Sequence, residues 1–258
     1  MADTPLGGAG VLVTRPQRQA EGLVEAIESK GGVPIRFPVI EARPLPKAEV
    51  IAVAATLHIP DIVILVSANA VRYGSRYTGD AAVAAVGPAT ARSVEKSGGQ
   101  VDIRSQHGFN SEHLLATPEL QDVAGKVVRI IRGNGGRELL ANVLRERGAT
   151  VEYLEVYQRV LPDYEESELA EIVASWRNGE IDVVTIMSVE TLRNLAQLLP
   201  AEGLEYLGKT RLVTPASRVI KAANGRFPGI PTKLAKGPLA DDIVDAIIAC
   251  MQPGHSDD

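Results

Sequence analysis

The stretch from Val127 to Arg159, VVRIIRGNGGRELLANVLRERGATVEYLEVYQR, decides the fold class of this chain. Its first residues, Val127 to Ile131, are apolar apart from Arg129 and rich in β-branched side chains. The run is too short for a helix and is typical of a buried strand. Apolar residues then recur at helical spacing from Leu139 to Leu144, and Gly148 ends this helix before a second strand begins. The stretch therefore predicts a strand, a glycine-rich loop, a helix and a second strand.

The glycine-rich loop RGNGGR is a candidate anion site. Glycines let backbone N–H groups converge at the N-terminus of a helix, where the helix dipole also favours negative charge. The loop consists of Arg132, Gly133, Asn134, Gly135, Gly136 and Arg137, and its two arginines add side-chain donors. A tight turn with two solvated arginines is the alternative interpretation, and the loop taken alone favours it.

Several segments of the chain occur twice. VLVTRP, from Val11, matches RIIRGN, from Arg129, and the extended segments that begin at Gly31 and Gly148 also match. DIVILVSANAV pairs with DVVTIMSVETL, and AVGPAT pairs with LVTPAS. Recurrence of several segments indicates an internal duplication, and strands that alternate with helices favour parallel sheets covered on both faces. The predicted fold is therefore α/β, with two similar doubly wound parallel-sheet domains.

The loops that follow the predicted strands contain the candidate binding residues. In doubly wound sheets these loops gather at the carboxyl edge, where ligands bind, so we expect them to line a cleft between the domains. Taken singly, Ser67, Thr90, Ser188 and Ser217 are most simply helix N-caps. The candidates outside the RGNGGR loop are Thr14, Arg15, Ser67, Asn69, Gly87, Thr90, Ser188, Thr214 and Ser217.

Composition narrows the functional classes. A chain of 258 residues with 45% hydrophobic side chains can fill two cores. Its single cysteine, Cys250, allows no disulfide framework, and its four histidines show no metal-ligand spacing, so we expect a reduced, cytoplasmic protein without a metal. A net charge of −5 without a basic block argues against nucleic acid, and no apolar run is long enough for a membrane span.

The order of the motifs LVTRP, LVSANAV, VGPATA, RGNGGREL, VYQR and TPAS, followed by GPLADDIVDAI, resembles the uroporphyrinogen-III synthase family over nearly the whole chain. The repeat alone would divide the chain near residue 120. The resemblance implies instead a discontinuous flavodoxin-like domain of residues 1–38 and 164–258, and an inserted flavodoxin-like domain of residues 47–155. It further implies that the crossings 39–46 and 156–163 pair as a two-stranded β-ladder hinge.

The resemblance also implies an activity. Members of the family cyclise hydroxymethylbilane to uroporphyrinogen III, with inversion of ring D through a spiro intermediate and loss of water, and without a cofactor. Tyr157 matches the tyrosine that the family places beside the cleft, so it is the candidate proton donor, with Tyr153 as the second candidate. A hinge tyrosine with an apolar ring and a solvated hydroxyl is the structural alternative for Tyr157. We expect a monomer.

Two other functions fit parts of the sequence. A two-domain cytoplasmic protein that binds a small anion without catalysis would share the same architecture. A nucleotide enzyme that uses RGNGGR for phosphate is disfavoured, because the loop lacks the lysine and the Ser/Thr of a P-loop and does not fit G-x-G-x-x-G.

Overall fold

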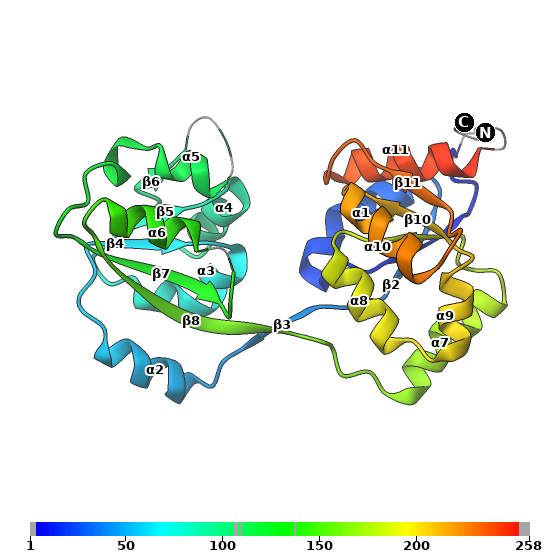
Figure 1. The fold of residues 1–258 in the computed structure, drawn as a ribbon, viewed down its shortest axis with the longest axis horizontal. Coiled ribbons are helices and arrows are strands. Elements are labelled where there is room, and N and C mark those ends of the chain that lie inside the picture. The colour runs from blue at the N-terminus through cyan, green and yellow to red at the C-terminus, as the bar shows by residue number, and fades with distance from the viewer. Residues whose placement is uncertain (1–3, 106–107, 109, 137, 253–258) are drawn as a thin grey trace. The chain divides into compact units, whose positions relative to one another are not determined.

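The computed structural model describes residues 4–105, 108, 110–136 and 138–252. The chain packs as two compact units, and each contains one sheet with helices on both faces (Figure 1). The terminal unit comprises Met1–Glu41 and Val160–Asp258, and the central unit comprises Ala42–Arg159.

The sheet of the terminal unit has five strands in the order β11-β10-β9-β1-β2, and every neighbouring pair is parallel. The register places Leu12 opposite Ile35 on one side and opposite Val184 on the other. The strands are β1 (Gly10–Val13), β2 (Val33–Arg36), β9 (Val183–Thr185), β10 (Arg211–Thr214) and β11 (Thr232–Leu234).

Two helical layers cover this sheet because successive side chains of a strand point to opposite faces. Val11 and Val13 pack in the layer of α1 (Gln17–Ser29) and α11 (Ala240–Met251), whereas Leu12 packs in the opposite layer. That layer contains α7 (Glu166–Arg177), α8 (Val189–Leu198), α9 (Ala201–Leu207) and α10 (Ser217–Arg226).

The sheet of the central unit has six strands in the order β3-β8-β7-β4-β5-β6. The pairs from β8 to β6 are parallel, and β3 lies at the edge beside β8, where the Leu45 N–H donates to the Val156 carbonyl at 3.1 Å. The strands are β3 (Glu41–Pro44), β4 (Ile62–Leu65), β5 (Ala82–Ala85), β6 (Ile103–Arg104), β7 (Val127–Gly133) and β8 (Thr150–Val160).

Helices also cover both faces of the central sheet. Leu114 of α5 (Ser111–Leu115) and Leu140 of α6 (Leu139–Glu146) pack on one face. Helices α2 (Lys47–Thr56), α3 (Ala68–Gly74) and α4 (Pro88–Lys96) pack on the other, which also buries Tyr157. The described part of this unit also contains short 3-10 helices at Ser75–Tyr77 and Pro118–Leu120.

The segments that recur in the sequence occupy equivalent places in the two sheets. When β1, β2, β9, β10 and β11 are matched with β7, β8, β4, β5 and β6, both sheets have the same spatial order. The predicted α/β fold with parallel sheets is therefore confirmed. Within the described residues, no helix combines the length and apolarity needed to cross a membrane.

Candidate functional site

Each sheet has a topological switch point, where two neighbouring strands are followed by connections to opposite sides of the sheet. In the terminal unit this switch point lies between β1 and β9, and in the central unit it lies between β7 and β4. Open α/β sheets bind ligands outside the carboxyl ends of the strands at such points. The loops that begin at Thr14 and Ile186 occupy this position in the terminal unit, and those that begin at Val66 and Asn134 occupy it in the central unit.

Ser67 and Tyr157 meet at the switch point of the central unit. Ser67 caps α3, since its Oγ accepts the Ala70 N–H at 3.1 Å, as predicted from sequence. The same Oγ lies 3.1 Å from the hydroxyl oxygen of Tyr157, whose side chain comes from β8 and is only 3% exposed. Asn69, in the first turn of α3, is half-buried.

The loop after β7 packs around Tyr157. The ring lies so close to Gly133 that a Cβ there would be 2.5 Å from ring atom Cε2. The Asn134 N–H donates to the Tyr157 carbonyl at 2.9 Å, and Asn134 Oδ1 accepts the Arg159 N–H at 3.0 Å. These contacts tie the end of β7 and its loop to Tyr157 and to Arg159, two residues further along β8.

The prediction that the loop begins at Arg132 was wrong. Arg132 and Gly133 belong to β7, because both residues pair with β8. A register shift between them places Gly133 opposite Tyr157. Gly135 is exposed and has a φ of +66°, a conformation that favours glycine. Arg137 lies outside the described residues.

Arg132 is already neutralised by carboxylates. Its guanidinium lies 2.9 Å from Glu138 and 3.3 Å from Glu155, and 3.6 Å above the centroid of the Tyr153 ring. The Tyr153 hydroxyl donates to Glu138, and burial together with this carboxylate raises the pKa of Tyr153. Arg132 and Tyr153 therefore form a structural cluster, which the sequence did not reveal because Glu155 reaches it by strand pairing.

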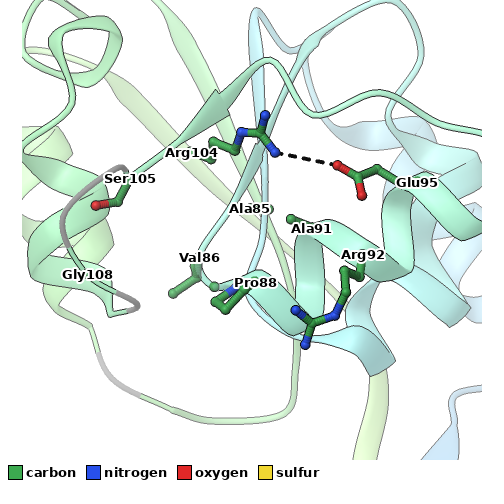
Figure 2. A pocket seen from close by; sticks show the side chains of 10 residues that line it. Ala85, Val86, Pro88, Ala91, Arg92, Glu95, Arg104, Ser105 and Gly108 are labelled. Carbon is green, nitrogen blue, oxygen red and sulfur yellow. Dashed lines mark ion pairs between the residues drawn. The ribbon is translucent and has the colours of Figure 1, made fainter.

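The loop after β5 opens on a hollow that is lined by Gly87, Pro88, Arg92 and Arg104, among others (Figure 2). Figure 2 shows Arg104 turned toward Glu95, with 3.6 Å between the charged groups. The N-cap of α4 is Gly87, which has no side chain to accept the first N–H groups.

The prediction that Thr90 is an N-cap was wrong. The helix starts at Pro88, two residues before Thr90. Proline suits the first helical position, because its fixed φ is helical and it lacks the N–H that would be unpaired there. Thr90 consequently lies inside α4, and its side chain is buried at 5% exposure.

In the terminal unit, threonines join the strands at the switch point. Thr14 is fully buried, and its Oγ1 donates to the Thr185 carbonyl. Thr185 Oγ1 in turn donates to the Leu12 carbonyl at 3.1 Å. These bonds fix the carboxyl ends of β1 and β9 side by side.

Arg15, the next residue, carries a partly buried charge. Its Nη2 donates to the Pro238 carbonyl at 2.8 Å, and its buried Nε has no partner among the described residues. Burial lowers the pKa of the Arg15 guanidinium, and within the described chain no carboxylate forms an ion pair with it. Arg15 is therefore a charged group suited to an anionic ligand.

The remaining candidates of the terminal unit lie at two helix starts. Ser188 caps α8 as predicted, since its Oγ accepts the Thr191 N–H at 3.1 Å. Thr214 is fully buried, and its Oγ1 accepts the Ala216 N–H at 3.2 Å. The N-cap of α10 is Ala216, whose backbone is extended, so the prediction that Ser217 is the cap was wrong; Ser217 is exposed in the first turn.

The geometry defines a class of protein: a parallel α/β protein of two similar units, with turns of small residues at the switch points of both sheets. A family model described as uroporphyrinogen-III synthase HemD matches residues 21–234. The uroporphyrinogen-III synthase of Escherichia coli K12 is 34% identical over 223 residues, which cover 83% of this chain and 89% of that protein. The chain belongs to the uroporphyrinogen-III synthase family, as its motifs indicated.

Two further comparisons agree. The uroporphyrinogen-III synthase of Salmonella typhimurium LT2 is 35% identical over 226 residues, which cover 83% of this chain and 89% of that protein. The crystal structure of uroporphyrinogen-III synthetase from Helicobacter pylori 26695 shares the fold, with a TM-score of 0.61 at 15% identity, and the match covers 94% of this chain and 99% of that one.

Proposed function

We propose that this protein is a cyclising hydro-lyase that converts hydroxymethylbilane to uroporphyrinogen III, with inversion of ring D through a spiro intermediate and loss of water. Membership of the family, shown by the model match over residues 21–234, is the observation that carries the proposal. We propose further that the protein works as a cytoplasmic monomer, without a cofactor and without nucleic acid.

The reaction depends more on which carbon is attacked than on the strength of a catalytic acid. The substrate loses its terminal hydroxyl readily, and the resulting azafulvene closes by itself to the unrearranged isomer. The enzyme must favour attack at the substituted carbon of ring D. A hundredfold preference needs only about 2.7 kcal/mol, at one decade per roughly 1.4 kcal/mol, and positioning can supply this amount.

Tyr157 is the proposed catalytic residue, as a hydrogen-bond donor to the departing hydroxyl. Its place at the switch point of the central unit and its contact with Ser67 support this role. Tyr153 is less suited, because its hydroxyl already donates to Glu138.

Main-chain amides are the proposed ligands of the substrate carboxylates. A hydrogen bond to a charged acceptor contributes about 1.5–3 kcal/mol, whereas an exposed ion pair contributes about 0.2–1 kcal/mol. The amides lie within Gly87 to Thr90, Gly133 to Gly136 and Thr214 to Ser217. Within these ranges the N–H groups of Asn134 and Ala216 are already bonded inside the protein, and Pro88 and Pro215 have no N–H. The candidate side chains for binding the carboxylates beside these amides are Thr14, Arg15, Ser67, Asn69, Thr90, Arg132, Asn134, Arg137, Ser188, Thr214 and Ser217.

The observed geometry ranks these side chains. Arg15 and Ser217 suit a carboxylate best, since Arg15 lacks an ion-pair partner in the described chain and Ser217 is exposed. Ser188 suits it less, because its Oγ already contacts Thr191. Thr14 and Thr214 are buried and bonded internally, so we assign them to shaping the loops.

We also propose that the two units are flavodoxin-like domains of residues 1–38 with 164–258 and of residues 47–155. The crossings 39–46 and 156–163 would form a two-stranded hinge. The place of β3 beside β8, and the change of unit at Glu41 and at Arg159, support this division.

Incubation of the purified protein with freshly made hydroxymethylbilane, followed by separation of isomers I and III, tests the function. We expect isomer III without added metal or nucleotide. Formation of isomer I alone, at the rate of the uncatalysed control, would contradict the proposal. If the protein then still bound hydroxymethylbilane tightly, the result would indicate an anion-binding protein without catalysis.

A further inference from the structure

The geometry points to Ser67 as a positioning residue that sets the direction in which the Tyr157 hydroxyl donates its hydrogen. This inference rests on the catalytic role proposed for Tyr157. It assigns to Ser67 a function beyond a contact with a substrate carboxylate.

The hydrogen bonds of Ser67 restrict its choices. A serine hydroxyl has one hydrogen and two lone pairs. One lone pair of Oγ accepts the Ala70 N–H at 3.1 Å, in the first turn of α3. The hydroxyl oxygen of Tyr157 lies at the same distance of 3.1 Å, so either residue could be the donor between them.

Only one of the two arrangements suits catalysis. If Tyr157 donates to Ser67, its hydrogen is not available to the substrate. If Ser67 donates to the Tyr157 oxygen, the phenol hydrogen is free to point at the departing hydroxyl. The N–H of Ala70 favours this second arrangement, because a hydroxyl that accepts a hydrogen bond becomes a stronger donor.

The rest of the tyrosine is held by packing. Its ring lies against Gly133 and is tilted toward Tyr73, with 6.0 Å between the centroids. Tyr73 is itself fixed, since its hydroxyl donates to the Ala42 carbonyl at 3.1 Å. Rotation of the Tyr157 hydroxyl is therefore the remaining freedom, and Ser67 is the side chain bonded to it.

The duplicated segment provides an internal comparison. Ser188 matches Ser67 in the sequence repeat and caps α8 in the same way. Its Oγ, however, lies 2.9 Å from Thr191 Oγ1 of its own helix, and no tyrosine of the described residues bonds to it. Capping a helix therefore does not require the contact with Tyr157, which is particular to the central unit.

A double-mutant cycle on kcat for isomer III, with Ser67→Ala and Tyr157→Phe, tests the inference. We expect Ser67→Ala to lower kcat roughly three- to tenfold, the effect of one ordinary hydrogen bond, and to raise KM by a smaller factor. In the Tyr157→Phe background the same substitution should have no effect on kcat, because the hydroxyl that it positions is gone.

Further variants separate positioning from capping. Ser67→Asp keeps a cap acceptor but cannot donate when ionised, so it should retain thermal stability and lose kcat as Ser67→Ala does. Ser67→Thr can cap and donate, so it should restore kcat. Asn110→Ala, which removes the cap acceptor of His113 N–H at α5, should lower the melting temperature without changing kcat.

The kinetic results distinguish a failure of the positioning role of Ser67 from a failure of the catalytic role of Tyr157. An equal loss of kcat on Ser67→Ala in both backgrounds would overturn the positioning role while leaving Tyr157 in the mechanism. A rise in KM alone would show that Ser67 binds a carboxylate and does not position the tyrosine. Full activity of Tyr157→Phe would remove Tyr157 from the mechanism, and the positioning role with it.

Discussion

The Cα of Gly133 lies against the ring of Tyr157, and a Cβ at this position would be 2.5 Å from Cε2 and 2.6 Å from Cζ, the carbon that bears the hydroxyl. Gly133→Ala should therefore displace the ring. Overpacking of this kind costs about 1–3 kcal/mol, so we expect a lower midpoint of urea unfolding. We also expect a smaller fraction of isomer III.

Gly22→Ala is the matched control. Gly22 lies in the interior of α1, is exposed, and has open space where a Cβ would be added. Alanine should stabilise the helix by about 0.5–1 kcal/mol and leave the isomer ratio unchanged. A Gly133→Ala variant that matched this control in both measurements would disprove the steric argument.

Tyr157→Phe should lower the rate of isomer III formation by about tenfold or more, since positioned proton donors contribute at least this much. The fold should persist, because the change removes one oxygen and a hydrogen bond to Ser67 worth about 1 kcal/mol. Far-ultraviolet circular dichroism checks that the fold is retained, and the isomer assay measures the rate of isomer III formation.

Tyr153→Phe is the comparison for this variant. It removes a hydroxyl that donates to Glu138 within the Arg132 cluster, and we expect the rate to remain near that of the unmodified protein. A larger loss for Tyr153→Phe than for Tyr157→Phe would exchange the roles of the two tyrosines.

Arg15→Met should raise KM for hydroxymethylbilane by about tenfold, the effect expected when one charged hydrogen bond is lost. The side chain keeps much of its packing, while the partly buried charge beside Pro238 disappears. Arg36→Met is the control, because Arg36 already binds both carboxylate oxygens of Glu21, at 3.0 and 2.9 Å. Equal KM values for the two variants would show that Arg15 serves only to hold the loop at Pro238.

The sequence predicts local features of this protein better than the contacts of its site. Ser67 and Ser188 were identified as N-caps, because the cap depends on residues within one turn. Thr90 and Ser217 were misplaced, because Pro88 and the extended Ala216 shifted the helix starts. The repeat indicated which strands are equivalent, since hydrophobic runs and turns recur in order.

Contacts that depend on the register between two paired strands were not predicted. The length of β7 and the position of Gly133 against Tyr157 follow from its register with β8, which includes a shift after Arg132. The neutralisation of Arg132 by Glu155 has the same origin. A single sequence contains the residues but does not specify this register.

Tyr164 should make the stability of the protein depend on alkaline pH. Its ring stacks on Phe37 with 4.6 Å between centroids, and its hydroxyl donates to the Pro38 carbonyl at 2.8 Å. Burial, with a smaller effect of Glu168, raises the pKa of Tyr164 to about 12. Because the folded pKa lies above the unfolded value of about 10, the unfolded chain loses this proton first. The contribution of Tyr164 is therefore complete below about pH 10 and is lost as the pH rises toward 12.

Urea unfolding from pH 8 to 12 tests this dependence. The unmodified protein should be more stable than Tyr164→Phe, by a margin that shrinks across this window. The comparison removes the effect of Tyr153, which is present in both proteins. An advantage that stayed constant or grew with pH would show that the phenolate of Tyr164 is not penalised in the folded protein.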